Sequence, residues 1–238
     1  MLNDLRRSLP GLGALLAVLT MVAVIALSFG GRGEREPGVV DRGPPGPPSS
    51  YYFEARIRAE GADPARPPVD LVRSWFEAPN RWRWEYAYAS NPDQSDSLQI
   101  SDGQSVTTYS ARTNTYQVRP AAAAQPPGRG LPMALFILGP LPADSLEAFL
   151  AQEEYSGHRR AGQDKILDRT VEVVEVDSGE SKLTLWIDMK RLFVLRYLLG
   201  PGPSGRGAIE AEIVDLRYNQ DIPAGVFSFE PPEGATEA

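Results

Sequence analysis

The chain contains no cysteine, and this absence excludes several kinds of function at once. Disulfide bonds, thiol catalysis and cysteine-ligated zinc all need that residue, as does the acylated N-terminal cysteine of a lipoprotein. Any attachment of this chain to a membrane must therefore come from the peptide itself.

Histidine is almost as scarce, because His158 is the only one. A single histidine excludes a multi-histidine metal site, and neither a Gly-x-Ser-x-Gly elbow nor a P-loop spacing is present. The acidic residues Glu153, Glu154 and those within 164–168 show no pairing that would make an acid and a base across a site. We therefore expect no catalytic residue, no cofactor, no metal ion and no enzymatic activity.

Basic charge is also in deficit, since the chain carries a formal net charge of −7. A surface that binds nucleic acid is usually strongly positive. The charge balance therefore argues against a nucleic-acid partner.

The first segment of note is the uncharged run of residues 9–29. As a helix it would extend about 31 Å, which matches a bilayer core of about 30 Å, so a single-pass transmembrane anchor is expected. A cleaved signal peptide remains an alternative, because Arg6 and Arg7 precede the run and small residues such as Ala26 offer a cleavage position. A buried helix is the third possibility. Whether residues 9–29 are a membrane anchor or a cleaved signal peptide, the rest of the chain is expected to be exported.

The remaining sequence divides at a stretch rich in proline and glycine. Residues 30–50 cannot bury enough apolar surface to fold, so they are expected to form a linker. The predicted organisation is a short cytoplasmic tail at 1–8, the anchor or signal segment at 9–29, the linker at 30–50 and one β domain at 51–238.

Alternation of apolar and polar residues predicts strands through most of this domain. Phe53, Ala55 and Ile57 alternate with charged residues, and Trp82 and Trp84 begin a second alternating run. Ten strands are expected, near residues 53–58, 69–77, 81–88, 97–101, 105–110, 115–119, 170–176, 182–188, 193–199 and 208–218.

Short turns between these runs predict antiparallel pairing. The Asp102-Gly103 pair suits a tight hairpin, and the turn at Ala78-Pro79-Asn80 joins two other runs. Alternation slips by one residue at 173–174 and at 213–214, where we expect β-bulges.

Helical pattern is confined to the middle of the domain. Residues 133–138 are apolar on every side, and Asp144 is expected to open a second helix with Glu147 as its capping-box partner. A large curved sheet would give such short apolar helices a surface to cover.

Three stretches resemble the outer-membrane lipoprotein carrier family, the LolA/LolB-like fold. Residues 75–85, WFEAPNRWRWE, resemble its Pro-Asn turn and aromatic, basic strand. Residues 100–104, ISDGQ, with Tyr109 and YQV at 116–118, are similar to its hairpin and following strand. Residues 227–234, FSFEPPEG, are similar to its closing F-x-F-x-P-P-x-G. The central residues 131–150 also fall where the family has its lid helices.

The resemblance implies a mainly β fold with short helices. Its large, curved, antiparallel sheet would form an unclosed half-barrel, covered by lid helices, around an apolar cavity that accepts acyl chains. The candidate lipid-binding residues are the walls Phe53, Ile57, Trp82, Trp84, Tyr86, Leu185, Ile187, Phe193 and Leu195, and the lid residues Leu135, Phe136, Leu138, Phe149 and Leu150. The same side chains would also fill an ordinary hydrophobic core, and the sequence leaves both interpretations open.

Three departures from the family bear on function. The soluble carriers begin with an amphipathic helix where this chain has its linker, they carry arginine where this chain has Ala78, and the membrane-bound receptors have an N-terminal cysteine. The sequence therefore resembles the fold more than either specialised role.

The leading hypothesis is a non-enzymatic binding protein for lipid or for the acyl chains of lipoproteins, a carrier or acceptor. It would be tethered to the cell membrane with its domain on the extracytoplasmic face, a side that the resemblance supplies because the flanking arginines do not decide it. The alternative, which the same fold implies, is an envelope-stress sensor or regulatory module that acts on an anti-sigma factor or another membrane protein.

Overall fold

The computed structural model describes residues 39–41, 45–59, 69–88, 91, 95–121, 138–141, 143–152, 157–177, 182–201 and 207–238. The chain divides into two compact units, Met1–Pro37 and Gly38–Ala238, and every described residue belongs to the second unit. The predicted tail at 1–8 and anchor at 9–29 lie outside the described residues. Within the described part of the chain, no helix is long and apolar enough to cross a membrane.

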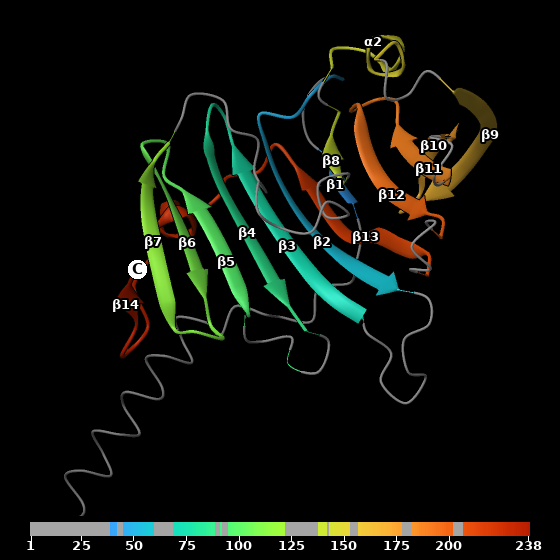
Figure 1. Cartoon of the computed structure of the whole chain (residues 1–238). Coiled ribbons are helices and arrows are strands. Elements are labelled where there is room, and N and C mark those ends of the chain that lie inside the picture. The colour runs from blue at the N-terminus through green and yellow to red at the C-terminus, as the bar shows by residue number, and fades with distance from the viewer. Residues whose placement is uncertain are drawn as a thin grey trace, which may run out of the picture. The chain divides into compact units, whose positions relative to one another are not determined.

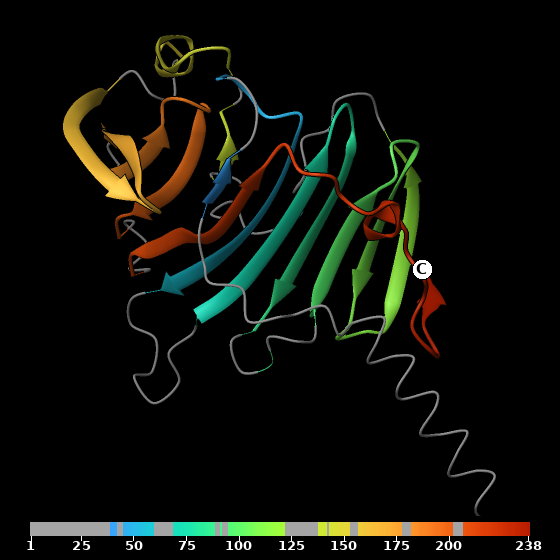
Figure 2. The same cartoon turned by 180° about the vertical axis from the view of Figure 1, so that it is seen from behind.

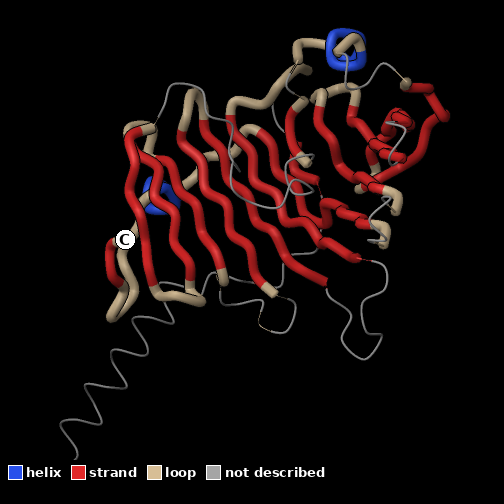
Figure 3. Tube along the Cα trace, viewed as in Figure 1, coloured by secondary structure: helices blue, strands red, loops and turns tan. Residues whose placement is uncertain are grey.

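The described residues form a single large sheet with very little helix (Figures 1 and 3). Its strands are β1 Val39–Asp41, β2 Ser50–Ala59, β3 Val69–Glu77, β4 Arg81–Ala87, β5 Ser97–Ser101, β6 Ser105–Ser110, β7 Thr115–Pro120, β8 Gly139–Pro140, β9 His158–Ile166, β10 Arg169–Asp177, β11 Lys182–Asp188, β12 Phe193–Leu199, β13 Ile209–Tyr218 and β14 Thr236–Glu237. The helical elements are α2 Leu146–Leu150 and the 3-10 turn η3 Ala224–Phe227.

The sheet does not close into a barrel. Its strand order is β14-β7-β6-β5-β4-β3-β2-β13-β12-β11-β10-β9, so β14 and β9 are its two edges. All pairs along this path are antiparallel except the parallel pair of β14 with β7. The mainly β, unclosed architecture that the resemblance implies is therefore confirmed.

The sheet splits between β12 and β13, and the split divides it into two regions. Only the ends of these strands pair with each other, Arg196–Leu199 with Ile209–Glu212. The start of β12 pairs instead with β8, and the end of β13 pairs in parallel with β1. Figure 1 shows the result, in which β9 to β12 curl around one another while β2 to β7 spread as a broad twisted surface.

Both predicted β-bulges are present. The register shifts between Val173 and Val174 in the pairing of β10 with β9, and around Val214 in the pairing of β13 with β2. A third shift lies between Trp186 and Ile187 in the pairing of β11 with β12. Bulges bend strands and increase local twist, which accounts for the curl of this end of the sheet.

The two predicted turns are present and they touch each other. Gly103 has a φ of +97°, and the Asp102 carboxylate accepts the backbone amides of Gln104 and Ser105, both at 2.7 Å. The Asn80 amide of the other turn donates to the Gly103 carbonyl at 2.9 Å. These hydrogen bonds tie the loop between β3 and β4 to the hairpin of β5 and β6.

The predicted second helix exists, but its start was placed one residue too early. The N-cap is Ser145, whose hydroxyl accepts the Ala148 amide at 3.0 Å. Position N3 is therefore Ala148, and the capping box expected from Asp144 and Glu147 is absent. The Glu147 carboxylate instead accepts a hydrogen bond from Arg160 of β9 at 2.7 Å. Of the other expected helix, 133–138, only Leu138 is described, at a bend before β8.

All ten predicted strands are found, and four further strands join them. Of the four, β9 is the longest, with nine residues. The short strand β1 comes from the stretch predicted as a linker and pairs with β13. Gly46 is also attached to the domain, because its amide donates to the Lys190 carbonyl at 2.9 Å.

Candidate functional site

The inner face of the sheet is the side that carries Tyr51, Phe53, Ala55 and Ile57 of β2. Residues that pair across two neighbouring strands point to the same face of the sheet. The pairing register therefore shows which residues of the neighbouring strands also lie on the inner face. One row runs from Phe53 through Ser74 of β3 to Trp84 of β4, and the next runs from Ala55 through Val72 to Tyr86. In the other direction, Ile57 is opposite Ala211 of β13, which is opposite Tyr197 of β12.

Aromatic rings line one end of the inner face. Tyr51 packs on Phe76 and on Phe193, with ring centroids 5.2 Å apart in both pairs. Phe53 meets Trp84 edge-on at 5.7 Å, and Phe193 meets Tyr218 at 5.2 Å. Such edge-to-face contacts fix ring positions more firmly than area burial alone, so this end of the interior is well ordered.

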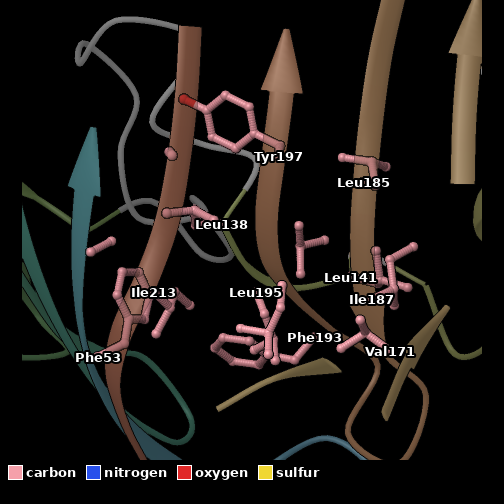
Figure 4. Close-up of a cluster of buried hydrophobic side chains, with 14 of the residues drawn as sticks. Phe53, Leu138, Leu141, Val171, Leu185, Ile187, Phe193, Leu195, Tyr197 and Ile213 are labelled. Carbon is pink, nitrogen blue, oxygen red and sulfur yellow. The ribbon is translucent and has the colours of Figure 1, made fainter. Parts of the chain in front are cut away.

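The short helix α2 covers part of this interior. Leu146, Phe149 and Leu150 are its buried residues, and the hydrophobic cluster that they join also contains Leu138 and Leu141. Figure 4 shows part of this cluster, with Leu138 and Leu141 among side chains from β2, β10, β11, β12 and β13. Among the described residues, one helical turn and the segment before it therefore form this part of the cover.

The structure brings the described candidate residues together. One buried cluster contains Phe53, Ile57, Trp82, Trp84, Leu138, Phe149, Leu150, Leu185, Ile187, Phe193 and Leu195, and Tyr86 packs against it from a half-buried position. The candidate lid residues Leu135 and Phe136 lie outside the described residues. The sequence therefore identified a real apolar interior.

From β5 to β7 the inner face carries mostly polar side chains. Ser97, Gln99 and Ser101 lie opposite the aromatic side chains of β4, and the row beyond them continues through Thr108 to Gln117. Thr108 and Gln117 are exposed, as is Arg119 at the end of β7. The buried apolar side chains of the interior therefore extend from β4 through β2 to Ile166 at the end of β9, with half-buried Val106 of β6 packed against them.

Among the described residues, some buried side-chain polar atoms of the inner face make no hydrogen bond of normal geometry. One is the Ser74 hydroxyl, which lies near the Tyr51 hydroxyl. Two others are the indole nitrogen of Trp84 and the hydroxyl of Tyr197, whose side chains are 4% and 0% exposed. Most buried polar groups are hydrogen-bonded, and an unmade bond costs about 1–3 kcal/mol. These atoms are therefore unusual within an otherwise apolar interior.

The tyrosines of the inner face differ in what surrounds their hydroxyls. Burial is the main cause that raises the pKa of Tyr86, followed by its hydrogen bond to Asp70 and by nearby negative charge. For Tyr197, burial alone raises the pKa. The Tyr197 hydroxyl is therefore neutral and is surrounded by apolar groups.

Sequence reasoning missed Tyr197, although a signal for it was present. Phe193 and Leu195 were both predicted as wall residues, and Tyr197 is the next position with the same period of two. Tyr51 is missed in the same way, one alternation before Phe53. Extending each predicted run by one step would have found both.

The outer face carries charged ladders instead of an apolar interior. Arg83 pairs with Glu85 and donates to the Val226 carbonyl at 3.0 Å. Arg81 pairs with Glu77 and lies over the Phe227 ring at 5.2 Å. Both arginines are therefore engaged by other groups of the protein itself.

Among the described residues, no group of three or more histidine, aspartate or glutamate side chains could hold a metal ion. His158 begins the strand β9, where it is exposed and lies opposite Val176 of β10. The candidate site of this domain is thus its apolar interior together with the buried polar atoms of Trp84 and Tyr197 in it.

The domain was compared with solved structures. An uncharacterised conserved protein from Thermus thermophilus matches at a TM-score of 0.47 and 11% identity, covering 80% of this chain and 90% of the other. MucB, in the complex structure of Pseudomonas aeruginosa MucA/MucB, matches at a TM-score of 0.45 and 13% identity, covering 76% of this chain and 56% of the other. The domain therefore spans little more than half of that MucB chain.

A LolA superfamily protein from Nitrosomonas europaea matches at a TM-score of 0.31 and 13% identity, covering 77% of this chain and 91% of the other. At such identities these likenesses say nothing of function. No curated protein matches the sequence.

A family match covers most of the domain. Residues 72–238, which include most of β3 and all of β4 to β14, match the family described as "Predicted periplasmic protein (DUF2092)". That description agrees with the extracytoplasmic side expected for the domain. The chain belongs to this family, DUF2092.

Proposed function

We propose that the domain binds the acyl chains of a lipid or of a lipoprotein in the apolar interior between its inner face and α2. The protein would act without catalysis, as an extracytoplasmic carrier or acceptor tethered to the membrane by residues 9–29. One observation carries the proposal. Side chains from β2, β4, β11, β12 and α2 converge on one apolar cluster at one end of an unclosed sheet.

The chemistry of this interior suits an acyl chain. Binding a hydrocarbon chain needs apolar walls and few directional contacts, since each buried methylene contributes about 0.8 kcal/mol. Small side chains, Ala55, Ser74 and Ala211, lie on the inner face between large aromatic ones, and all three are 0% exposed. A chain would lie over this floor of small residues.

The short helix α2, which covers part of the interior, would also give an acyl chain a route of entry. Helix α2 is five residues long and is attached to the sheet by three apolar side chains and by the pair of Glu147 with Arg160. That ion pair is largely exposed, at 70% and 51% for the two side chains, so solvent screens it. Displacing one such turn would open the interior without breaking any strand pair.

The alternative function is a regulatory module that acts on a membrane protein. The outer edge of β9 supports it, because β9 pairs with β10 alone among the described strands and eight of its nine residues are exposed. An extended segment of a partner could add to such an edge. Arg159, Arg160 and the glycine bulge at Gly162 oppose this, because charges and bulges usually protect free edges.

The test compares two added rings on the same face of the sheet. Ala55→Phe places a ring in the apolar part of the inner face, and Thr108→Phe places one in its exposed polar part. The full chain is purified from membranes, and its co-purifying lipids are extracted and measured by mass spectrometry. We expect lipid on the wild-type protein and on Thr108→Phe, and at least a tenfold loss on a folded Ala55→Phe.

Three results would contradict the proposal. The first is a wild-type protein that carries no lipid and accepts none. The second is unfolding of the domain by Ala55→Phe, as overpacking of an already filled core would cause. The third is recovery of one cross-linked membrane protein without lipid, which would favour the regulatory alternative.

A further inference from the structure

The buried hydroxyl of Tyr197 bears on which acyl compound the interior would take. This inference rests on the proposed function, because it concerns the same interior. Tyr197 is fully buried and its hydroxyl has no hydrogen-bond partner. In Figure 4 the hydroxyl lies at the margin of the apolar cluster and points away from Phe193 and Leu195.

The neighbours of Tyr197 leave the hydroxyl without protein partners. The residue opposite it on β13 is Ala211, and the residue beyond, on β2, is Ile57. Neither carries a polar side chain. By contrast, the Tyr109 hydroxyl on the outer face donates to the Asn114 side chain at 3.0 Å. The hydroxyl of Tyr197 thus remains available for a ligand atom.

A second polar atom on the same face points to the same ligand chemistry. The Trp84 indole nitrogen is also buried and unpaired, and an indole N–H can only donate. A tyrosine hydroxyl donates equally well. An apolar interior with two free donors is matched by a ligand that brings hydrogen-bond acceptors.

The acceptor must be neutral. Among the described residues, those that face Tyr197 across the sheet are Leu185, Ala211 and, beyond it, Ile57, and none of them is charged. A buried carboxylate would therefore find no cation beside it, and transferring an unpaired charge into an apolar site is very costly. A carbonyl oxygen of an ester or amide avoids that cost and accepts a hydrogen bond.

We propose that Tyr197 is a specificity-determining residue that donates a hydrogen bond to the ester or amide carbonyl of a bound acyl chain. The site would thus select acyl esters and amides, such as glycerolipids or the acylated end of a lipoprotein, over free fatty acids. The Tyr197 hydroxyl has no hydrogen-bond partner among the described residues, so its hydrogen bond would be made with the ligand.

The substitution Tyr197→Phe tests this inference, with Tyr109→Phe as a matched control. Both variants lose one hydroxyl from a tyrosine on the sheet. Removing the unpaired hydroxyl of Tyr197 should leave the melting temperature unchanged or raise it, whereas Tyr109→Phe loses a hydrogen bond and should lower it. Thermal unfolding followed by circular dichroism shows that each variant is folded.

Binding is measured on the purified full chain in amphipol, with three probes that have similar chain lengths. They are methyl palmitate with a ¹³C carbonyl, palmitate, and heptadecane, which has no polar atom. Bound probe is separated by gel filtration and quantified by gas chromatography. The infrared carbonyl band of bound methyl palmitate reports its hydrogen bonding directly.

We expect the ester to bind more tightly than palmitate, and its carbonyl band to lie below the position found in an alkane solvent. Tyr197→Phe should weaken ester binding about fivefold and return the band to the alkane position, without changing heptadecane binding. Tyr109→Phe should change none of these values.

Two results would overturn the inference while the proposed function stands. One is equal ester binding by wild type and Tyr197→Phe with an unshifted carbonyl band, and the other is tighter binding of palmitate than of the ester. Failure of all three probes to bind would overturn the proposed function and this inference together.

Discussion

Two parts of the sheet, one that includes β2 and β4 and one from β5 to β7, bury their apolar residues on opposite faces. In β2 and β4 the buried apolar side chains, among them Phe53 and Trp84, lie on the inner face with α2 over part of it. In β5 they are Leu98 and Ile100, which lie on the outer face. The alternation is equally clear in both parts, so the pattern identifies strands but does not tell which face a second layer will cover.

The cover of the second part is the C-terminal segment. Figure 2 shows it crossing the outer side of β4 to β7 after β13. Phe229 packs between Tyr109 and Tyr116, with ring centroids 5.8 and 5.4 Å away, and β14 then pairs with β7. The first part is thus covered in part by a short helix, and the second by residues 224–238 at the end of the chain, a segment that we call the clamp.

The largest effect is expected from Phe53→Ala in the interior. Phe53 is fully buried between Trp84 and Phe193, so its loss should lower the free energy of unfolding by about 4 kcal/mol. Urea denaturation measures this, with Val118→Ala, 44% exposed on β7, as the control. A cost for Phe53→Ala no larger than that of the control would contradict a single cooperative core.

A smaller and more local effect is expected from Phe227→Ala in the clamp. Phe227 is buried under Arg81 but lies outside the main cluster, so we expect a loss of about 3 kcal/mol. Hydrogen exchange should rise in residues 224–238 and in β7 while β11 and β12 keep their protection. Equal loosening of β12 would show that the two regions do not behave separately.

The smallest effect is expected from Gly103→Ala in the hairpin of β5 and β6. The φ of +97° disfavours any side chain, and an added Cβ would lie 2.8 Å from the Asn80 Oδ1 atom. A loss on the order of 2 kcal/mol should follow, measured by urea denaturation. Gly225→Ala is the control, since a Cβ there meets nothing within 4 Å. An equal loss of stability in Gly103→Ala and Gly225→Ala would contradict a stabilising contact between the turn at Asn80 and the hairpin at Gly103.

Much of this architecture could be predicted because it follows from the local pattern of apolar, polar and turn-forming residues. Ten strands, two bulges and the Asp102-Gly103 hairpin follow from alternation and turn chemistry. Strand β9 could not be found in this way. Its sequence HRRAGQDKI has no apolar alternation, because an edge strand with eight exposed residues gains its structure from pairing with β10 and not from burial.

Most residues of the apolar interior could be predicted from the sequence, but their arrangement in space could not. The sequence by itself determined which side chains are apolar and with what period, and hence most of the wall residues. Only the tertiary structure decided that β12 and β13 part, that β5 buries its other face, and that the Tyr197 hydroxyl is left without a partner. These features depend on contacts between residues far apart in the chain, such as Tyr197 with Ala211 and Phe229 with Tyr116, and local periodicity carries no information about such contacts.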